Sequence, residues 1–412
     1  AKFRFGWSRC SPLNAALCVS IQVNNEEIMH IYRYRSSGLL TIKELMYDEL
    51  YFASQAELND PVDMLANFKF FSGERELWQK TVFQITGNER VAELAATYLD
   101  SICPISYQEL LSSYEKHGQA MITSIAASLG TRENFSSLLV SLYNSLQKLL
   151  EVYRPNTGYS VSFAKANDEM LMWSHYAGSH KGCCFIFRPV NNAIHQCHLR
   201  SRDSIKVTKH FSCGMPLELG LKNINYSSDI DAMSGFTLFP SAYTGLKFES
   251  EDLRLKFHSD KEKQLLIKNP CWKYEEEVRL LLHQPSRWVD GESEFSPFQR
   301  VFHYDSSQLV GVIFGASMSN VDKANIKEIL DMKLDSRRVS ERKGKQYIFD
   351  FLYQQASICP SSRKVQIQNL ELVSHGARYT PQSSKFNEHY IKWLLGAGIT
   401  YENGTMSYGS IK

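Results

Sequence analysis

The chain has 412 residues, of which 43% are hydrophobic and 22% charged, and its formal net charge at pH 7 is +2. This composition is typical of a globular protein with enough residues for two or three compact units. So small a net charge gives no overall field that would attract nucleic acid or an anionic membrane, so any such contact needs a local patch.

We expect no membrane-spanning segment and no secretion signal. No apolar run approaches the roughly 20 residues that cross a bilayer, and the cations of "AKFRFGWSRC" are not followed by the apolar block of a signal peptide. The nine cysteines are scattered and form no C-x-x-C pair. We therefore expect a cytoplasmic protein with reduced thiols and no membrane contact.

The first ordered segment is predicted to form a strand, a helix and a second strand. "HIYRYRS" alternates arginine and tyrosine at period two, "SGLLTIKELMYDE" has helical spacing, and "LYFAS" is short and apolar. The "NDP" that follows is a strong turn signal, because Pro61 restricts Asp60, whose carboxylate can close a side-chain turn.

From residue 74 to residue 153 the pattern becomes amphipathic and helical, with breaks at Pro104 and Gly130. We predict a helical insertion there, whose apolar stripes serve packing.

After the insertion the strand pattern returns. "TGYSVSFAK" and "CCFIFRPV" predict strands on either side of a helix over 170–178, and "CWKYEEEVRLLLHQ" and "LVGVIFGASMSN" predict two more. A helix with Asn320 as its N-cap should follow the last strand.

Strands without regular βα alternation favour an α+β fold. We expect a small twisted sheet from segments near 31–35, 50–54, 159–163, 183–188, 276–282 and 311–315. The domain organisation that follows is an N-terminal segment over 1–28, an α+β core over 29–350 with its insertion at 74–153, and a C-terminal extension over 351–412.

"MLMWSHYAGSHKG" is the first candidate site segment. His175 or Tyr176 could face a cleft and bind a ligand while Trp173 anchors the helix, with Lys181 closing the turn after it. The alternative is a half-buried aromatic helix whose polar tips are satisfied locally.

Charged residues on two predicted strands form the second candidate group. Glu275 and Glu277 share one face of "KYEEEVRLL", where buried unpaired carboxylates would be costly, and Arg279 could pair with either. Arg33 and Arg35 share a face of "HIYRYRS" and could hold a phosphate or carboxylate. They could equally pair with the two glutamates in a structural network.

No metal site is expected. "HQCHLRSR", with His210 and Cys213 downstream, contains metal-binding residue types, but their spacing fits no standard zinc pattern.

Four segments together resemble a largely bacterial family, domain-of-unknown-function family two-nine-seven-one. They are "YRYR…LYFASQAELNDPVD", "YSVSFAK…MLMWSHYAGSHKGCCFIF", "WKYEEEVRLL" and "GVIFGASMS", and the resemblance runs from about His30 to Lys333. The family label implies no activity.

The order of these features also resembles the layout of ADP-ribosyltransferases. That layout has a cationic or histidine residue on a first strand, a serine- and tyrosine-bearing strand and helix, and a late-strand glutamate. The resemblance implies NAD as substrate, with Glu277 or Glu275 as the catalytic carboxylate, Tyr176 stacking on the nicotinamide, Arg33 or Arg35 holding the phosphates and Ser162 bracing the site. The motifs themselves add His175 to the candidate catalytic residues and Asn59, Asp60 and Lys181 to the candidate cofactor-binding residues, as further walls of the same cleft. Ser162 departs from the layout because it is not within a Ser-Thr-Ser triplet.

The resemblance leads to the expectation of an NAD-cleaving enzyme, a mono-ADP-ribosyltransferase-like toxin or defence effector. The alternative is a nucleotide- or nucleic-acid-binding sensor, or a nuclease, of a bacterial defence system without NAD chemistry. The expected interactions are a protein or nucleic-acid target and self-association or a partner chain. The basic loop 198–210 could guide a nucleic-acid or phosphate-bearing substrate, and its alternative is a solvated loop.

Overall fold

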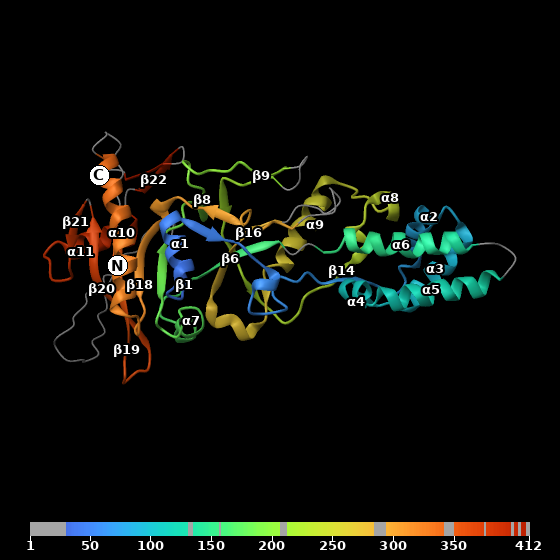
Figure 1. Ribbon diagram of the computed structural model, residues 1–412, viewed down its shortest axis with the longest axis horizontal. Helices are drawn as coiled ribbons and strands as arrows, with labels where there is room; N and C mark the ends of the chain where they lie inside the picture. The colour runs from blue at the N-terminus through green and yellow to red at the C-terminus, as the bar shows by residue number, and fades with distance from the viewer. Residues whose placement is uncertain are drawn as a thin grey trace, which may run out of the picture.

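The computed structural model describes residues 30–130, 135–155, 158–206, 212–283, 294–341, 350–374, 376–396, 399–402 and 405–408. It confirms the α+β class: a large mixed sheet lies toward one end of the molecule and a helical lobe toward the other (Figure 1). The predicted segment 1–28 and residues 207–210 of the basic loop lie outside the described residues. In the described ranges, no helix has both the length and the hydropathy to cross a bilayer.

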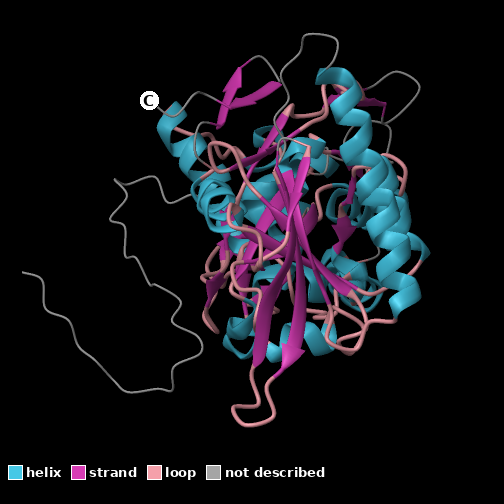
Figure 2. Cartoon of the chain, turned by 90° about the vertical axis from the view of Figure 1, so that its left-hand side faces the viewer, coloured by secondary structure: helices cyan, strands magenta, loops and turns pink. Residues whose placement is uncertain are grey.

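The main sheet has ten strands, and helices lie on both sides of its strands in Figure 2. Its order is β12 (Lys222–Asn223), β16 (Glu277–Leu282), β6 (Tyr159–Ala164), β1 (Ile31–Arg35), β7 (Cys183–Phe187), β18 (Leu309–Phe314), β19 (Phe351–Ile358), β20 (Val365–Ser374) and β21 (Ala377–Tyr379), with β3 (Ala53–Ser54) paired to β6.

Five of the six predicted strands lie in this sheet. The predicted strand at 50–54 is divided, because β2 (Glu49–Tyr51) pairs with β17 (Val301–His303) outside the main sheet and only β3 joins it. The sheet also extends into 351–374 through β19 and β20, a region that the sequence analysis assigned to an extension outside the core.

Helices cover both faces of the sheet. α10 (Asn320–Glu341) and α1 (Leu39–Tyr47) pack on the face that carries Phe314 and Tyr353, whereas α7 (Met170–His175) and α11 (Phe386–Leu395) pack on the opposite face. The N-cap of α10 is Ser319 rather than the predicted Asn320, because the Ser319 Oγ accepts a hydrogen bond from the Asp322 amide at 3.0 Å.

The helical lobe contains the predicted insertion and has its own hydrophobic core. The helices of the insertion are α2 (Arg75–Thr86), α3 (Glu89–Ser101), α4 (Tyr107–Ser112), α5 (Tyr114–Leu129) and α6 (Ser136–Val152).

A second, later segment joins this lobe. Phe236 and Phe239 lie in the lobe's core, and β14 (Met233–Ser234) pairs with β4 (Phe68–Phe70), which also pairs with β5 (Ile105–Ser106). The same segment continues into η2 (Gly235–Leu238), α8 (Ser241–Thr244) and α9 (Glu251–Gln264), and Figure 1 shows the two α-helices on the side of the helical lobe. No pattern in the sequence predicted this contribution.

Short elements complete the described fold. Strand pairs outside the main sheet are β8 (Ala193–His195) with β11 (Glu218–Gly220), β9 (Ser204–Lys206) with β10 (Ser212–Gly214), β13 (Asn225–Tyr226) with β15 (Ile267–Lys268), and β22 (Ile399–Glu402) with β23 (Thr405–Tyr408). The remaining 3-10 turns are η1 (Gln55–Glu57), η3 (Pro270–Glu275) and η4 (Ser306–Gln308).

The sheet opens between β1 and β6. β1 pairs with β7 at all five of its residues, and β6 pairs with β16 at all six, but β1 and β6 meet at the single pair Tyr32–Ala164. The Arg33 Nη1 donates to the Ser162 carbonyl oxygen at 3.2 Å, so a side chain here replaces a backbone partner. This opening positions the site.

Candidate functional site

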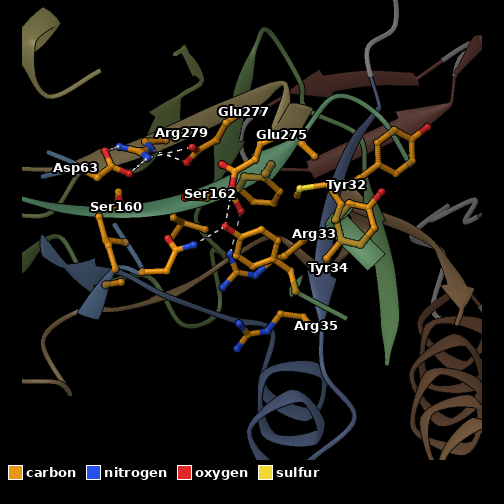
Figure 3. Close-up of a pocket in the computed structure, with 18 of the residues that line it drawn as sticks. Tyr32, Arg33, Tyr34, Arg35, Asp63, Ser160, Ser162, Glu275, Glu277 and Arg279 are labelled. Atoms are coloured by element: carbon orange, nitrogen blue, oxygen red, sulfur yellow. Dashed lines mark hydrogen bonds and ion pairs between the residues drawn. The ribbon is translucent and has the colours of Figure 1, made fainter. Parts of the chain in front are cut away.

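A pocket of about 300 Å³ lies where β1 and β6 part. Its walls come from β1, α1, the segment 51–63, β6, Met172 and Tyr176 of the α7 region, and the stretch from β15 through β16. Figure 3 shows Asp63, Glu277 and Arg279 on one side of the pocket and Arg33 and Arg35 on the other.

The pocket brings together seven of the ten residues predicted to form the site. Those that line it are Arg33, Arg35, Asn59, Ser162, Tyr176, Glu275 and Glu277, whereas Asp60, His175 and Lys181 are not among the lining residues. Whether the seven bind or cleave NAD stays a prediction.

Asp60 shapes the wall without contributing to its surface. Its carboxylate accepts a hydrogen bond from the Val62 amide at 3.0 Å, and its carbonyl accepts one from the Asp63 amide at 3.2 Å. The predicted side-chain turn is therefore present, and it carries Asn59 and Asp63 into the pocket lining.

His175 lies on the wrong side of its helix for a site residue. Met172 and Tyr176, four residues apart, both line the pocket. His175 is rotated from Tyr176 by about 100°, and its exposed ring lies 6.3 Å from that of Tyr274. The expectation that both His175 and Tyr176 point inward holds for Tyr176 alone.

The His180-Lys181-Gly182 turn packs behind β1, and the Lys181 side chain is exposed. The Gly182 amide donates to the Ala177 carbonyl at 2.8 Å, and the Gly182 carbonyl accepts from the Gly315 amide at 2.8 Å. A Cβ at Gly182 would overlap the carbonyl oxygen of Arg35. The turn therefore supports β1 where Arg35 enters the pocket.

A buried chain of charges forms the carboxylate end of the pocket. Arg279 donates to both Asp63 oxygens, at 2.8 and 2.5 Å, and to both Glu277 oxygens, at 2.5 and 3.0 Å. The Lys268 Nζ lies 2.9 Å from the Glu277 Oε2 and 2.5 Å from the Glu275 Oε2. The pairing of Arg279 with Glu277 confirms one of the structural pairings that the sequence suggested, while Arg33 pairs elsewhere.

Glu277 is held as a carboxylate. Burial alone would raise its pKa, but the charge and hydrogen bonds of Arg279, followed by the charge of Lys268, outweigh burial and lower the pKa of Glu277 to about 2. Both of its oxygens already accept bonds from these cations.

The pKa of Glu275 is shifted in the opposite direction, because burial outweighs its cationic neighbour. Burial raises the pKa of its carboxyl, and the charge of Lys268 and the hydrogen bonds from Lys268 and Tyr176 lower it only in part, so the pKa stays above its ordinary value. The Tyr176 hydroxyl donates to the Glu275 Oε1 at 2.5 Å and accepts from the Asn59 Nδ2 at 2.8 Å. Glu275 therefore takes up a proton more readily than Glu277.

Arg33, Arg35 and Glu44 form the cationic end. Arg35 donates to Glu44, and the Arg33 Nη2 lies 3.9 Å from the same Glu44 oxygen. Burial, followed by the charge of Arg35, lowers the pKa of Arg33 to about 10. The Nε atoms of both arginines are buried and have no hydrogen-bond partner among the described residues. The more exposed guanidinium is that of Arg35, whose side chain is 28% exposed, so an anion in the pocket could reach it.

Glu275 and Glu277 both contact Lys268, but the backbone between them differs from the predicted strand. They were assigned to one continuous strand over 276–282, but β16 begins at Glu277, and Glu275 ends the turn η3. Glu276 between them has a left-handed backbone with φ 43° and an exposed side chain. The left-handed residue turns the chain so that both neighbours contact Lys268.

Asp63, Lys268 and Glu44 were missed by the sequence analysis. Asp63 follows the recognised "NDP" turn by two residues, and Lys268 interrupts the apolar run "LLIKNP". A lysine inside an apolar run requires a buried counter-charge, and this signal could have identified Lys268. Glu44 lies on α1 with ordinary helical spacing and gives no such signal.

The histidine and cysteine segment around residues 195–213 forms no site in the described structure. The His195 Nε2 lies 3.2 Å from the Val190 carbonyl oxygen, and His210 lies outside the described residues. In the described part of the chain no group of three or more histidine, cysteine or acidic side chains could hold a metal ion.

Comparison with known proteins identifies a family over part of the chain. Residues 172–280 match the model of a family described as "Protein of unknown function (DUF2971)". This segment includes Tyr176, Lys268, Glu275, Glu277 and Arg279 of the pocket. No curated protein and no solved structure matches the chain. Over residues 172–280 the chain is therefore similar to this family of unknown function, the family that its motifs predicted.

Proposed function

We propose that the pocket binds NAD and cleaves the bond between its nicotinamide and ribose. The observation that carries this proposal is the opposite charge of the two ends. With all groups ionised, the carboxylate end holds three acids (Asp63, Glu275 and Glu277) against Lys268 and Arg279, a net charge of −1. The cationic end holds Arg33 and Arg35 against Glu44, a net charge of +1.

NAD has the complementary charges. Its nicotinamide ring is a cationic pyridinium, and its pyrophosphate is an anion that a guanidinium binds well. We place the pyridinium toward Glu275 and the pyrophosphate toward Arg33 and Arg35.

In the reaction, the bond between ribose C1′ and the ring nitrogen breaks, and its electron pair goes to the nitrogen, which makes nicotinamide neutral. Positive charge develops on the ribose, and a nearby carboxylate stabilises it. Water or a nucleophile of the target then bonds to C1′ and gives its proton to a base. Water yields ADP-ribose, whereas a protein or nucleic-acid nucleophile yields an ADP-ribosylated target.

Glu275 is the better candidate for the acting carboxylate. Arg279 and Lys268 occupy both oxygens of Glu277, whereas the Glu275 Oε1 is bonded to the Tyr176 hydroxyl, a group that a ligand could displace. Burial raises the pKa of Glu275, which also suits a residue that accepts a proton in the reaction. Glu277 would then act as a positioning residue that holds Lys268 and Arg279.

Nicotinamide release from NAD tests the proposal. Glu275→Gln should lower the rate by about 100-fold or more, the usual effect of losing a group that stabilises transition-state charge or transfers a proton. Glu276→Gln is the matched control, because its exposed side chain lies between the two pocket glutamates in sequence, and it should stay within about twofold of the unmodified protein.

Absence of nicotinamide release, or equal rates for the Glu275 and Glu276 variants, would overturn the proposal. Stabilisation by NAD without turnover would favour the alternative of a nucleotide sensor, and degradation of oligonucleotides without NAD would favour a nuclease.

Depletion of NAD would stop growth, so we extend the proposal to a toxin or defence effector. Induced expression in a bacterium should arrest growth and lower cellular NAD, and the Glu275→Gln variant should do neither. Harmless expression of the intact protein with unchanged NAD would contradict this role.

A further inference from the structure

We infer that the pocket encloses only a mononucleotide with a cationic base, so that nicotinamide mononucleotide is itself a substrate. This inference rests on the proposed NAD cleavage and specifies which part of the ligand the protein recognises. It is carried by the size of the cavity, the separation of its charged ends and the gradient of exposure between them.

The cavity is small for a dinucleotide. Its volume of about 300 Å³ is at the lower end of the range for sites that enclose small ligands, which extends to about 1,000 Å³. A dinucleotide contains two nucleotide halves, so a cavity of this size can enclose one of them.

The two charged ends are close enough for one nucleotide. β6 separates β16, which carries Glu277 and Arg279, from β1, which carries Arg33 and Arg35. One strand spacing, between β16 and β6, corresponds to roughly 5 Å, and the Arg33 Nη1 spans the opening between β1 and β6 to lie 3.2 Å from the Ser162 carbonyl oxygen. A single ribose separates the pyridinium from the phosphate in nicotinamide mononucleotide, so one mononucleotide presents both charges within the cavity.

Polar groups in the middle of the cavity suit a ribose. Ser162 on β6 has an exposed side chain among the lining residues, and Asn59 is also exposed there. A hydroxyl and an amide can bond to sugar hydroxyls in either direction.

Exposure decreases from the arginines toward the glutamates. The exposed fraction of the side chain is 28% for Arg35 and 10% for Arg33, but 4% for Glu275. The mouth of the cavity therefore lies along Asn59, Ser162 and Arg35, and Glu275 lies at its closed end, so the pyridinium would enter first. A phosphate at Arg35 would lie near solvent, so the second phosphate and the adenosine of NAD would extend outside the enclosed volume.

The experiment measures kcat/KM for nicotinamide release by the full chain from NAD, nicotinamide mononucleotide and nicotinamide riboside. We expect the mononucleotide to lie within tenfold of NAD. The riboside, which lacks the phosphate, should be at least tenfold poorer than the mononucleotide.

Arg35→Met removes the guanidinium at the mouth and keeps most of the apolar stem. It should lower kcat/KM for the mononucleotide at least tenfold and leave that for the riboside within twofold. General damage to the fold would lower both. The control is Arg90→Met, because Arg90 is an exposed arginine on the helical lobe with a carboxylate partner of its own, Glu93, and it should change neither value.

Two results would overturn the inference while leaving NAD cleavage intact. One is a kcat/KM for the mononucleotide more than tenfold below that for NAD. The other is an equal loss of kcat/KM for the mononucleotide and the riboside in Arg35→Met. No release from any of the three compounds would overturn the proposed function itself, and the inference with it.

Discussion

Replacing Arg279 by methionine should destabilise the protein strongly at neutral pH. Arg279 is among the largest fully buried side chains, and its guanidinium bonds to Asp63 and Glu277. Methionine fills much of the volume of the stem but leaves Lys268 alone with three buried carboxylates.

Two estimates of the loss in unfolding free energy agree in magnitude. Removing one partner of a buried ion pair typically costs about 3–5 kcal/mol. Independently, the lowering of the Glu277 pKa from 4.5 to about 2 corresponds to about 3 kcal/mol of stability at neutral pH.

The loss should depend on pH in a definite direction. The pKa of Glu277 is lower in the folded protein than in the unfolded chain, so the stability it confers is complete above pH 4.5 and is lost as the pH falls toward 2. Without Arg279, burial would raise that pKa, and the ionised carboxylate would be most costly at pH 7. The difference between the two proteins should therefore be smaller at pH 4 than at pH 7.

Urea unfolding followed by tryptophan fluorescence at both pH values measures this difference. We expect a loss of about 3–5 kcal/mol at pH 7, and a change within about 0.5 kcal/mol for the exposed control Arg90→Met. A loss below about 1 kcal/mol at pH 7, the range of an exposed ion pair, would refute the reasoning. An equal loss at pH 4 and pH 7 would refute it as well.

Two further predictions concern the walls of the pocket. Tyr176→Phe removes a hydrogen bond that lowers the pKa of Glu275. The rate of nicotinamide release should therefore rise at a higher pH in the variant than in the unmodified protein. An unchanged pH profile would argue against Glu275 as the acting carboxylate. Gly182→Ala should lower the thermal unfolding midpoint by several degrees, because the new Cβ overlaps the Arg35 carbonyl. Gly220→Ala, with no atom within 4 Å of the added Cβ, should change the midpoint little, and equal effects of the two substitutions would contradict this account of the turn.

The sequence predicted the central strands because their signals are local. β1 alternates at period two, and β7 and β18 are continuous apolar runs bounded by turns. β19 and β20 were not assigned to the core because "FLYQQASI" and "VQIQNLELVS" mix glutamine and serine with apolar residues, and their place beside β18 depends on long-range pairing.

The site was predictable where motifs carry chemistry and was missed where partners are distant in sequence. The run of three glutamates marked the carboxylate end, and the tyrosine-arginine alternation marked the cationic end. Which glutamate is the less constrained depends on Lys268 and Arg279, whose contacts follow from the backbone turn at Glu276. The prediction that His175 points into the pocket was wrong. Met172 and Tyr176 are four residues apart and share the face of α7 that lines the pocket, whereas His175 lies on a different face.

The most direct test of the central claim is a crystal structure of the Glu275→Gln protein with NAD bound. The account predicts the nicotinamide ring beside residue 275 and Tyr176, with the adjoining phosphate against Arg33 and Arg35. NAD bound outside this pocket, or bound in it with a phosphate against Lys268, would contradict the account.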